Sequence, residues 1–482
     1  MSNQTRKRVL IIGGGISGLA AVHRLGELRG DRPIDISLLE AGPRLGGVIR
    51  TYERDGFLLE GGPDAFISEK PEALALAQRL GLTDRLISTN EQYRRSFVVR
   101  HGKLRSIPDG FHLLAPSRFW PFATSGICSL PAKFRISGEL FVPRRKATET
   151  EDESLAAFVR RRFGDEALTR LAQPLIGGIY TADPEKLSLR ATMPRFLNME
   201  AKHGSVIRAL WNQRKDGQQG SGEGTSGARY SLFLSFDRGT QVLSDAVAAH
   251  LPSGTVRLNA GVSSVIRSAA DPGWLCRLEN GETLMADALC LATPARRSAA
   301  IVSEFNPELA GELASIPYAS SATINLAYRR SDIAHRLNGF GFVVPAVEGR
   351  SIIACSFSSV KFAGRAPDGH VLLRAFAGGA LQPEIFALDD EEMLRRAILD
   401  LTELLGITAP PLFTQIERWA NSMPQYHLGH LERVGRIEQL AAAHANFALA
   451  GNTFGGAGIP DCIRSGESAA ETLLAGITEP AA

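Results

Sequence analysis

The chain has 482 residues, of which 44% are hydrophobic and 22% charged, values typical of a soluble globular protein. A formal net charge of +3 is too small to indicate a nucleic-acid-binding protein. The length exceeds that of one compact core, so two or three domains are expected.

The N-terminal segment "RVLIIGGGISGLAAVHRLGEL" predicts a buried strand over 9–12, a tight turn and a helix from about residue 17. A second strand, "IDISLLE", ends at Glu40. Gly13, Gly15 and Gly18 have the spacing of a dinucleotide-binding turn, in which glycines permit the turn, admit a pyrophosphate and let helix and strand pack closely. A carboxylate at Glu40 accepts hydrogen bonds from the ribose and disfavours the 2′-phosphate of NADP.

Two more glycine pairs follow: Gly46-Gly47 in "EAGPRLGGVIRT" and Gly61-Gly62 in "LLEGGPDAF". Glycine lets a ligand approach the backbone closely. Three such turns suit a ligand longer than the first half of a nicotinamide dinucleotide, so the sequence favours FAD over NAD.

The remaining chain predicts helices, strands and one loop. The fold class is therefore α/β, with a Rossmann-like dinucleotide-binding domain, an α+β substrate domain built on an antiparallel sheet, and a helical insertion near 110–212. The predicted elements are a helix over 71–81, a surface loop over 213–229, a β-meander over 255–293, strands over 322–328 and 371–377, and an amphipathic helix over 390–406.

Near the C-terminus, "AGNTFGGAGIPD" precedes a predicted last helix, "CIRSGESAAETLLAG". A helix N-terminus carries unpaired N–H groups and a partial positive charge. The glycines ahead of it predict a second place where a ligand contacts the backbone.

Several motifs resemble known sequences over essentially the whole chain. "VLIIGGGISGLAA" with "LLEAGPRLGGVIRT" resembles the flavin-containing amine oxidase superfamily. "QPLIGGIYTADPEKLSL", "ERWANSMPQYHLGH" and "LAGNTFGGAGIPDCIRSG" are similar to its protoporphyrinogen and coproporphyrinogen III oxidase branch. The resemblance implies an amine-oxidase-like fold and the FAD-dependent, six-electron oxidation of a porphyrinogen in haem biosynthesis, with oxygen as the expected acceptor. Protoporphyrinogen IX and coproporphyrinogen III both remain open as substrates.

The resemblance also implies a domain order in which the FAD-binding domain is assembled from three segments. The expected boundaries are 1–92, 230–297 and 415–482 for the FAD-binding domain, 93–110 and 298–414 for the substrate domain, 111–212 for the helical domain, and 213–229 for a flexible loop.

Non-covalent FAD is implied, with contacts from all three FAD-binding segments. Ala457, Gly458 and Ile459 are expected to line the flavin ring near Trp419, and Val262 to contact the adenine. The full set of expected contacts is Gly13, Gly14, Gly15, Ser17, Gly18, Glu40, Ala41, Arg44, Gly46, Gly47, Gly61, Gly62, Pro63, Asp64, Val262, Trp419, Gly451, Ala457, Gly458 and Ile459.

For the substrate, the resemblance implies that Gly177 and Gly178 let the macrocycle lie close to the backbone, while Phe340, Val343 and Phe362 sandwich the pyrroles. Core packing is the alternative for the apolar side chains.

Plant and mitochondrial relatives have a propionate-binding arginine where this sequence aligns Ser96, so Arg95 and its basic neighbours remain candidates for that partner. A solvated hairpin is the alternative for this basic cluster.

No catalytic side chain and no metal site are expected, because the flavin itself accepts the electrons. His427 and His430, in "HLGH", are expected to lie in a loop or to satisfy backbone groups.

Five scattered cysteines and the absence of a signal-peptide pattern in the first residues fit a cytoplasmic protein. The segment 111–135 mixes aromatic and basic residues; it is expected either to contact a membrane surface peripherally or to roof the substrate channel. A homodimer and product transfer to a ferrochelatase are partners to consider. The alternative functions are another flavin amine oxidase or phytoene-desaturase-like enzyme, and a non-catalytic FAD-binding chaperone.

Overall fold

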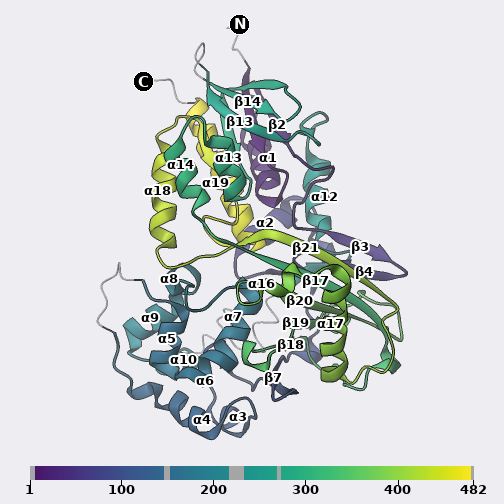
Figure 1. The fold of residues 1–482 in the computed structure, drawn as a ribbon. Coiled ribbons are helices and arrows are strands. Elements are labelled where there is room, and N and C mark those ends of the chain that lie inside the picture. Colours follow the sequence, from purple (N-terminus) through teal and green to yellow (C-terminus); the bar gives the residue numbers. More distant parts are fainter. Residues whose placement is uncertain (1–5, 146–151, 216–232, 269–272, 479–482) are drawn as a thin grey trace.

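The computed structural model describes residues 6–145, 152–215, 233–268 and 273–478. The chain forms an α/β part that carries both termini, an antiparallel sheet in the middle, and a helical part at the opposite end (Figure 1). No helix among these residues is long and apolar enough to cross a membrane.

The α/β part is built on a parallel sheet with the strand order β12-β2-β1-β16-β22. Residues 9–12 are at most 5% exposed, as expected for a parallel strand covered on both faces. The strands are Lys7–Ile12 (β1), Ile34–Leu39 (β2), Val256–Arg257 (β12), Ala288–Leu291 (β16) and Phe447–Leu449 (β22).

The first and last helices, α1 (Ile16–Leu28) and α19 (Ile459–Thr478), pack against each other beside this sheet (Figure 1). A Cβ atom at Gly466 would lie 2.0 Å from the Ser17 carbonyl oxygen, so the two backbones meet at this glycine. Helix α19 begins earlier than predicted because Pro460 fits the first helical turn, where its missing N–H costs nothing. The other helices of this part are Pro71–Arg79 (α2), Gln241–His250 (α12), Ala295–Val302 (α13), Pro307–Ala314 (α14) and His430–Ala442 (α18).

The predicted β-meander is correct for its middle three strands, β13 (Val262–Arg267), β14 (Trp274–Leu278) and β15 (Thr283–Ala286). The prediction is wrong at its two ends, because β12 and β16 join the parallel sheet instead. Small sheets complete this part, with strands Thr51–Arg54 (β3), Phe57–Glu60 (β4), Phe66–Ile67 (β5), Leu86–Ser88 (β6) and Phe233–Phe236 (β11).

The central sheet has seven strands in the order β21-β17-β20-β19-β18-β7-β8, and only the β18–β7 pair is parallel. One face is apolar and packs against α17 (Asp390–Leu405), which Asp389 caps and the left-handed Gly406 ends. The strands are Phe97–Arg100 (β7), Lys103–Ser106 (β8), Tyr318–Arg329 (β17), Gly341–Val343 (β18), Ile352–Phe357 (β19), His370–Gly378 (β20) and Phe413–Pro424 (β21), with short helices Ser358–Lys361 (α15) and Pro383–Ala387 (α16).

The helical part has its own apolar core and an ion-pair network within it. The fully buried Arg162 pairs with Glu139 and Glu200. The predicted helical stretch starts late, because the short strands β9 (Phe111–His112) and β10 (Ala115–Pro116) come first. The helices are Phe119–Thr124 (α3), Leu130–Ser137 (α4), Leu155–Phe163 (α5), Asp165–Ala167 (α6), Gln173–Tyr180 (α7), Leu189–Thr192 (α8), Pro194–His203 (α9) and Val206–Lys215 (α10), with a π-helical turn over Leu168–Ala172.

The start of the predicted loop over 213–229 is helical, since α10 extends to Lys215. The rest of that loop lies outside the described residues.

Candidate active site

The first glycine turn joins β1 to α1 and contains two kinds of glycine. At Gly13, with φ of +110°, an added Cβ would lie 2.4 Å from the Ala292 carbonyl oxygen, and at Gly18 it would lie 1.9 Å from that of Gly13. At Gly15 no atom lies within 4 Å of the same position. Gly13 and Gly18 are therefore required by packing, whereas Gly15 borders open space.

Glu40 follows β2 and is fixed by backbone amides. Its carboxylate accepts hydrogen bonds from the N–H groups of Gly14 and Gly42, each at 2.7 Å. Its carbonyl oxygen accepts one from Ala260 at 2.8 Å, which brings the segment before Val262 alongside. Each carboxylate oxygen keeps a free lone pair, so Glu40 can still accept hydrogen bonds from ribose hydroxyls. Ala41 follows Glu40 and leads toward the second glycine turn, at Gly46 and Gly47. The Val262 side chain is buried.

The second glycine turn docks directly on the first. Gly46 donates its N–H to the Gly14 carbonyl at 2.8 Å, and Gly46 and Gly47 have φ values of +99° and +58°. Arg44 donates to the carbonyl oxygens of Leu45 and Gly47, each at 2.6 Å. Arg44 therefore braces its own turn.

The third turn is held by side chains on the polar face of the central sheet. Thr323 and Trp419 donate to the Gly61 carbonyl oxygen at 2.6 and 2.9 Å, and Arg374 donates to that of Gly62. A Cβ at Gly62 would lie 1.7 Å from the Val48 carbonyl oxygen, so this position admits only glycine. Pro63 and Asp64 continue the turn, their carbonyls accepting from Thr240 and Ser235.

The C-terminal loop leads into α19 and is held through its carbonyl groups. Tyr426 donates to Asn452, and the buried His430 contacts the Thr453 carbonyl oxygen at 3.0 Å. Burial lowers the pKa of His430 to about 4, so the ring is neutral at pH 7. His430 therefore satisfies a backbone group, as expected.

Glycines give this loop its shape. Gly451 and Gly456 have φ values of +141° and +128°, and Gly458, which with Ala457 leads into Ile459, is exposed. Among the residues placed by the structure, no three His, Cys, Asp or Glu side chains form a group able to hold a metal ion.

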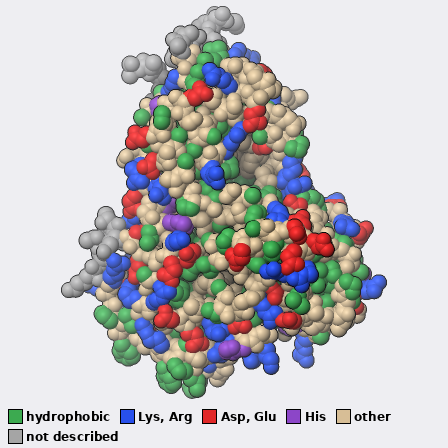
Figure 2. Space-filling view, in the orientation of Figure 1, with side chains coloured by type: hydrophobic (Ala, Val, Ile, Leu, Met, Phe, Trp, Pro, Cys, Tyr) green, Lys and Arg blue, Asp and Glu red, His purple; other side chains and the backbone are tan. Residues whose placement is uncertain are grey.

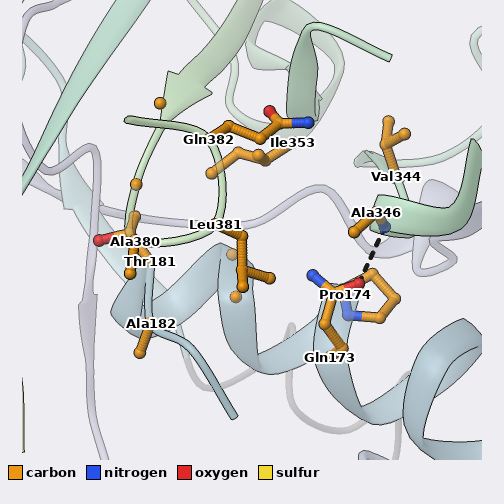
Figure 3. A pocket seen from close by; sticks show the side chains of 14 residues that line it. Gln173, Pro174, Thr181, Ala182, Val344, Ala346, Ile353, Ala380, Leu381 and Gln382 are labelled. Atoms are coloured by element: carbon orange, nitrogen blue, oxygen red, sulfur yellow. Dashed lines mark hydrogen bonds between the residues drawn. The ribbon is translucent and has the colours of Figure 1, made fainter. Parts of the chain in front are cut away.

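Gly177 and Gly178 lie in α7 and line a pocket between this helix and the loop after β20 (Figure 3). Gly178 is exposed, and a Cβ there would have Val343 Cγ1, at 3.8 Å, as its nearest neighbour. The half-buried Val343 and the exposed Gly178 are thus brought together from distant segments.

The two predicted phenylalanines are deeply buried instead. Phe340 is 3% exposed, and Phe362 is 1% exposed between Lys361 and Arg365, 5.1 and 5.5 Å from its ring centroid. Their burial favours core packing, the alternative considered for them. Phe376, which no sequence motif singles out, is half-buried on the polar face of the sheet, opposite Thr323.

The basic cluster lies just before β7 and on the β7–β8 hairpin. Arg95 is exposed, and its carbonyl oxygen accepts the Phe340 N–H at 2.8 Å, whereas Ser96 is 6% exposed. Arg94 pairs with Glu91, and Arg100 donates to the Gly126 carbonyl oxygen at 3.0 Å. Arg95 is therefore better placed than Ser96 to meet a carboxylate from solvent.

Comparison with known proteins decides the family. Residues 16–474 match the family described as "Flavin containing amine oxidoreductase". The chain belongs to this family. Family membership confirms the resemblance and the predicted amine-oxidase-like fold class, and it makes the chain a flavin-dependent oxidoreductase.

Three comparisons span nearly the full chain. Coproporphyrinogen III oxidase from Bacillus subtilis (strain 168) is 34% identical, covering 97% of this chain and 98% of that protein. The enzyme of that name from Propionibacterium freudenreichii is 36% identical, with coverage of 97% and 90%. A crystal structure provisionally named a protoporphyrinogen oxidase, from Exiguobacterium sp. 255-15, has a TM-score of 0.84 and 29% identity, covering 97% of this chain and 99% of that one.

The residues present fit a flavin nucleotide. Open space borders Gly15, an acceptor-rich carboxylate stands at Glu40, and the exposed Gly458 precedes the N-terminus of α19. These features suit the pyrophosphate, the ribose and the ring of a flavin nucleotide, respectively.

Proposed function

We propose that the protein is an FAD-dependent porphyrinogen oxidase of haem biosynthesis that holds its FAD non-covalently. The observation that carries the proposal is full-length similarity to coproporphyrinogen III oxidases at 34% and 36% identity. Two features of the site support it: the glycine turns around Gly15 and Gly46, and the exposed Gly178 opposite Val343.

When bound, FAD supplies a two-electron acceptor for each of three successive oxidations of the macrocycle, and oxygen is the expected final acceptor. The chain's own residues then bind and orient. Gly15 and Gly46 would border the pyrophosphate and Glu40 the ribose, while Gly61 and α19 would lie beside the ring. Gly178, Val343 and Phe376 would form an apolar wall that orients the macrocycle and excludes water. No side chain has to move a proton, because pyrrole N–H protons leave after tautomerisation.

Coproporphyrinogen III is the substrate we propose. The plant protoporphyrinogen oxidase 2 of Arabidopsis thaliana is only 27% identical, below the coproporphyrinogen III oxidases. The exposed Arg95, next to the strand that leads to Val343, would meet one of the four propionates.

Anaerobic reduction of the bound flavin by each porphyrinogen tests this function. Faster reduction by coproporphyrinogen III than by protoporphyrinogen IX is expected. Reduction by neither substrate, in a preparation with full flavin occupancy, would contradict the proposal and favour a non-catalytic FAD-binding protein.

We also propose that the tip of the helical part rests on an anionic lipid surface. Five large apolar side chains are exposed there: Phe119 51%, Trp120 75%, Leu130 68%, Phe134 78% and Phe141 87%. Figure 2 shows hydrophobic side chains gathered at this end of the molecule, over α3 and α4. Residues 110–138 contain three Lys or Arg residues and no Asp or Glu. Aromatic side chains with basic neighbours suit the headgroup region of an anionic membrane.

Flotation with vesicles tests the lipid contact. Binding to phosphatidylglycerol vesicles, little binding to phosphatidylcholine vesicles, and loss of binding in Trp120→Ser/Phe134→Ser are expected. Leu399→Ser, at a residue 50% exposed on α17, is the control. Equal flotation of the double variant would refute a lipid role, and self-association abolished by the double variant would assign the tip to a second copy instead.

A further inference from the structure

Three cationic side chains stand behind the third glycine turn, on the side of the central sheet that faces it. Arg374 comes from β20, Lys361 from the end of α15, and Arg365 from the loop between them. Arg374 and Arg365 are 3% and 2% exposed. The carboxylates that act on them are Asp64 and Glu60, both from the chain around that turn, and Asp237, which acts on Arg365.

The pairing within this cluster is incomplete. Lys361 contacts Asp64 at 2.8 Å, and Arg374 reaches the same carboxylate only at 3.8 Å. Arg365 donates to neutral acceptors alone, namely Ser235 Oγ and the carbonyl oxygens of Phe236 and Asp237.

Glu60 does not complete the charge pairing of this cluster. Its carboxylate accepts from Thr51 Oγ1 at 2.7 Å and from the Thr240 N–H at 2.8 Å, and burial raises its pKa. Burial alone would raise the pKa of Asp64 as well, but Lys361, Arg374 and Arg365 outweigh it and hold that pKa at about 2. Arg374 therefore has no contact with a carboxylate closer than the 3.8 Å to Asp64.

Arg374 also has an unpartnered donor. Its Nε atom is buried and has no hydrogen-bond partner, although Nη2 donates to the Gly62 carbonyl oxygen. Asn325, its register partner on β17, is fully buried and has an unpartnered Oδ1. The Arg374 guanidinium lies 4.8 Å from the Phe376 ring centroid, so this ring offsets part of the cost of burying the charge. The unpartnered Nε remains costly in a dry interior unless a ligand supplies compensating charge or dipole.

A flavin meets that requirement, since its two-electron reduction with uptake of one proton leaves one negative charge on the ring. We propose that Arg374, oriented by Gly62 and Asp64, is a positioning residue whose fixed charge stabilises the reduced, anionic form of the bound flavin. The proposal rests on the proposed function only for the presence of a flavin beside Gly61 and Gly62, and it makes no use of the substrate. In a low-dielectric site, such a charge raises the reduction potential of the flavin.

The test is the midpoint potential of the bound flavin in the purified holoprotein, titrated with xanthine and xanthine oxidase against a reference dye. Arg374→Met is expected to shift the potential to a more negative value, and Arg374→Lys, which keeps the charge, to stay closer to the parent. Asp64→Asn removes a negative charge from the same cluster and should shift the potential the opposite way. Arg238→Met, at an exposed arginine paired with Glu53, is the matched control and should leave it unchanged.

A parental potential in Arg374→Met with flavin bound would overturn the proposal. The Met and Lys variants could lose flavin equally, with an unshifted midpoint potential in the fraction that remains bound. That result would mean that Arg374 serves only as a structural hydrogen-bond donor. If Arg374→Met does not retain flavin, the midpoint potential of Asp64→Asn is the deciding measurement. The proposal is overturned if that potential does not become more positive, or if Asp64→Asn also fails to retain flavin. Because no porphyrinogen is used, a wrong substrate assignment leaves the outcome intact.

Discussion

Gly178 offers a substitution that separates function from folding. It lies within α7, is exposed to the pocket, and has helical rather than left-handed backbone. A Cβ there would make only an ordinary contact, 3.8 Å from Val343 Cγ1. The structure therefore removes the alternative that Gly178 supplies a backbone angle closed to other residues.

Gly178→Ala is accordingly expected to fold as well as the parent or better, because alanine stabilises a helix interior by about 0.5–1 kcal/mol relative to glycine. If the macrocycle rests against this backbone, the new methyl group displaces it by about 1 Å. Such a displacement costs on the order of a hundredfold in rate, about 2.7 kcal/mol of transition-state stabilisation. Gly178→Val should lower the rate at least as far while keeping bound FAD.

The assay is stopped-flow anaerobic reduction of the flavin by porphyrinogen, with flavin occupancy and melting temperature measured on the same preparation. Gly311→Ala, at another helical glycine with no atom within 4 Å of an added Cβ, is the control and should reduce at the parental rate. A well-folded Gly178→Val that also reduces at the parental rate would remove Gly178 from the substrate site.

Three further predictions concern the cofactor, pH and stability. Glu40→Ala should weaken FAD binding by about 1.5–3 kcal/mol through lost hydrogen bonds to a charged acceptor, measured by titrating apoprotein; unchanged affinity would exclude Glu40 from the ribose site. The pKa of His430 is depressed to about 4 from 6.5, so its contribution to stability is full above pH 6.5 and is lost as pH falls toward 4. His430→Asn should flatten that part of the stability–pH curve, and an equally steep curve would contradict the burial argument. Arg162→Met leaves Glu139 buried without its cationic partner and should cost about 3–5 kcal/mol in urea unfolding. Arg162→Met/Glu139→Gln removes that charge but keeps an acceptor for the Ser205 hydroxyl and the Val206 N–H, and should cost less; equal losses would rule out a charge effect.

The parts of the fold that the sequence predicted are those with strong local periodicity. The helix over 390–406 and the strands around 322–328 and 371–377 have apolar residues at regular spacing, and each appears within a few residues of its predicted bounds. Strand β22 could not be predicted, because three residues carry no measurable period and its place is fixed by pairing with β16. The same limit explains why the sequence pattern predicts a meander that includes β12 and β16.

The alternation of side chains between the two faces of a strand also explains which residues of the candidate site the sequence predicts. Phe340 and Val343 are an odd number of positions apart, so a regular strand cannot present both on one face. In the structure, β18 begins only at Gly341, Phe342 packs with α17 and Val343 faces the helical part. The same alternation in "VLLRAFA" places Arg374 and Phe376 together on the polar face, a signal present in the sequence but not used.

The glycines of the candidate site fall into two classes, according to whether an added Cβ would clash with the chain or meet open space. The sequence motifs alone do not separate these classes. At Gly18, Gly62 and Gly466 an added Cβ would lie within 2.0 Å of a backbone oxygen, so these positions hold the protein's own segments together. At Gly15 no atom lies within 4 Å, and at Gly178 only Val343 does, so packing within the chain explains neither. Glycine at such open positions costs conformational entropy, and no close packing within the chain compensates for that cost. Openness alone is no sign of a ligand, since the control position Gly311 is equally open. Gly15 and Gly178 differ from it because they border the regions proposed for the pyrophosphate and the macrocycle.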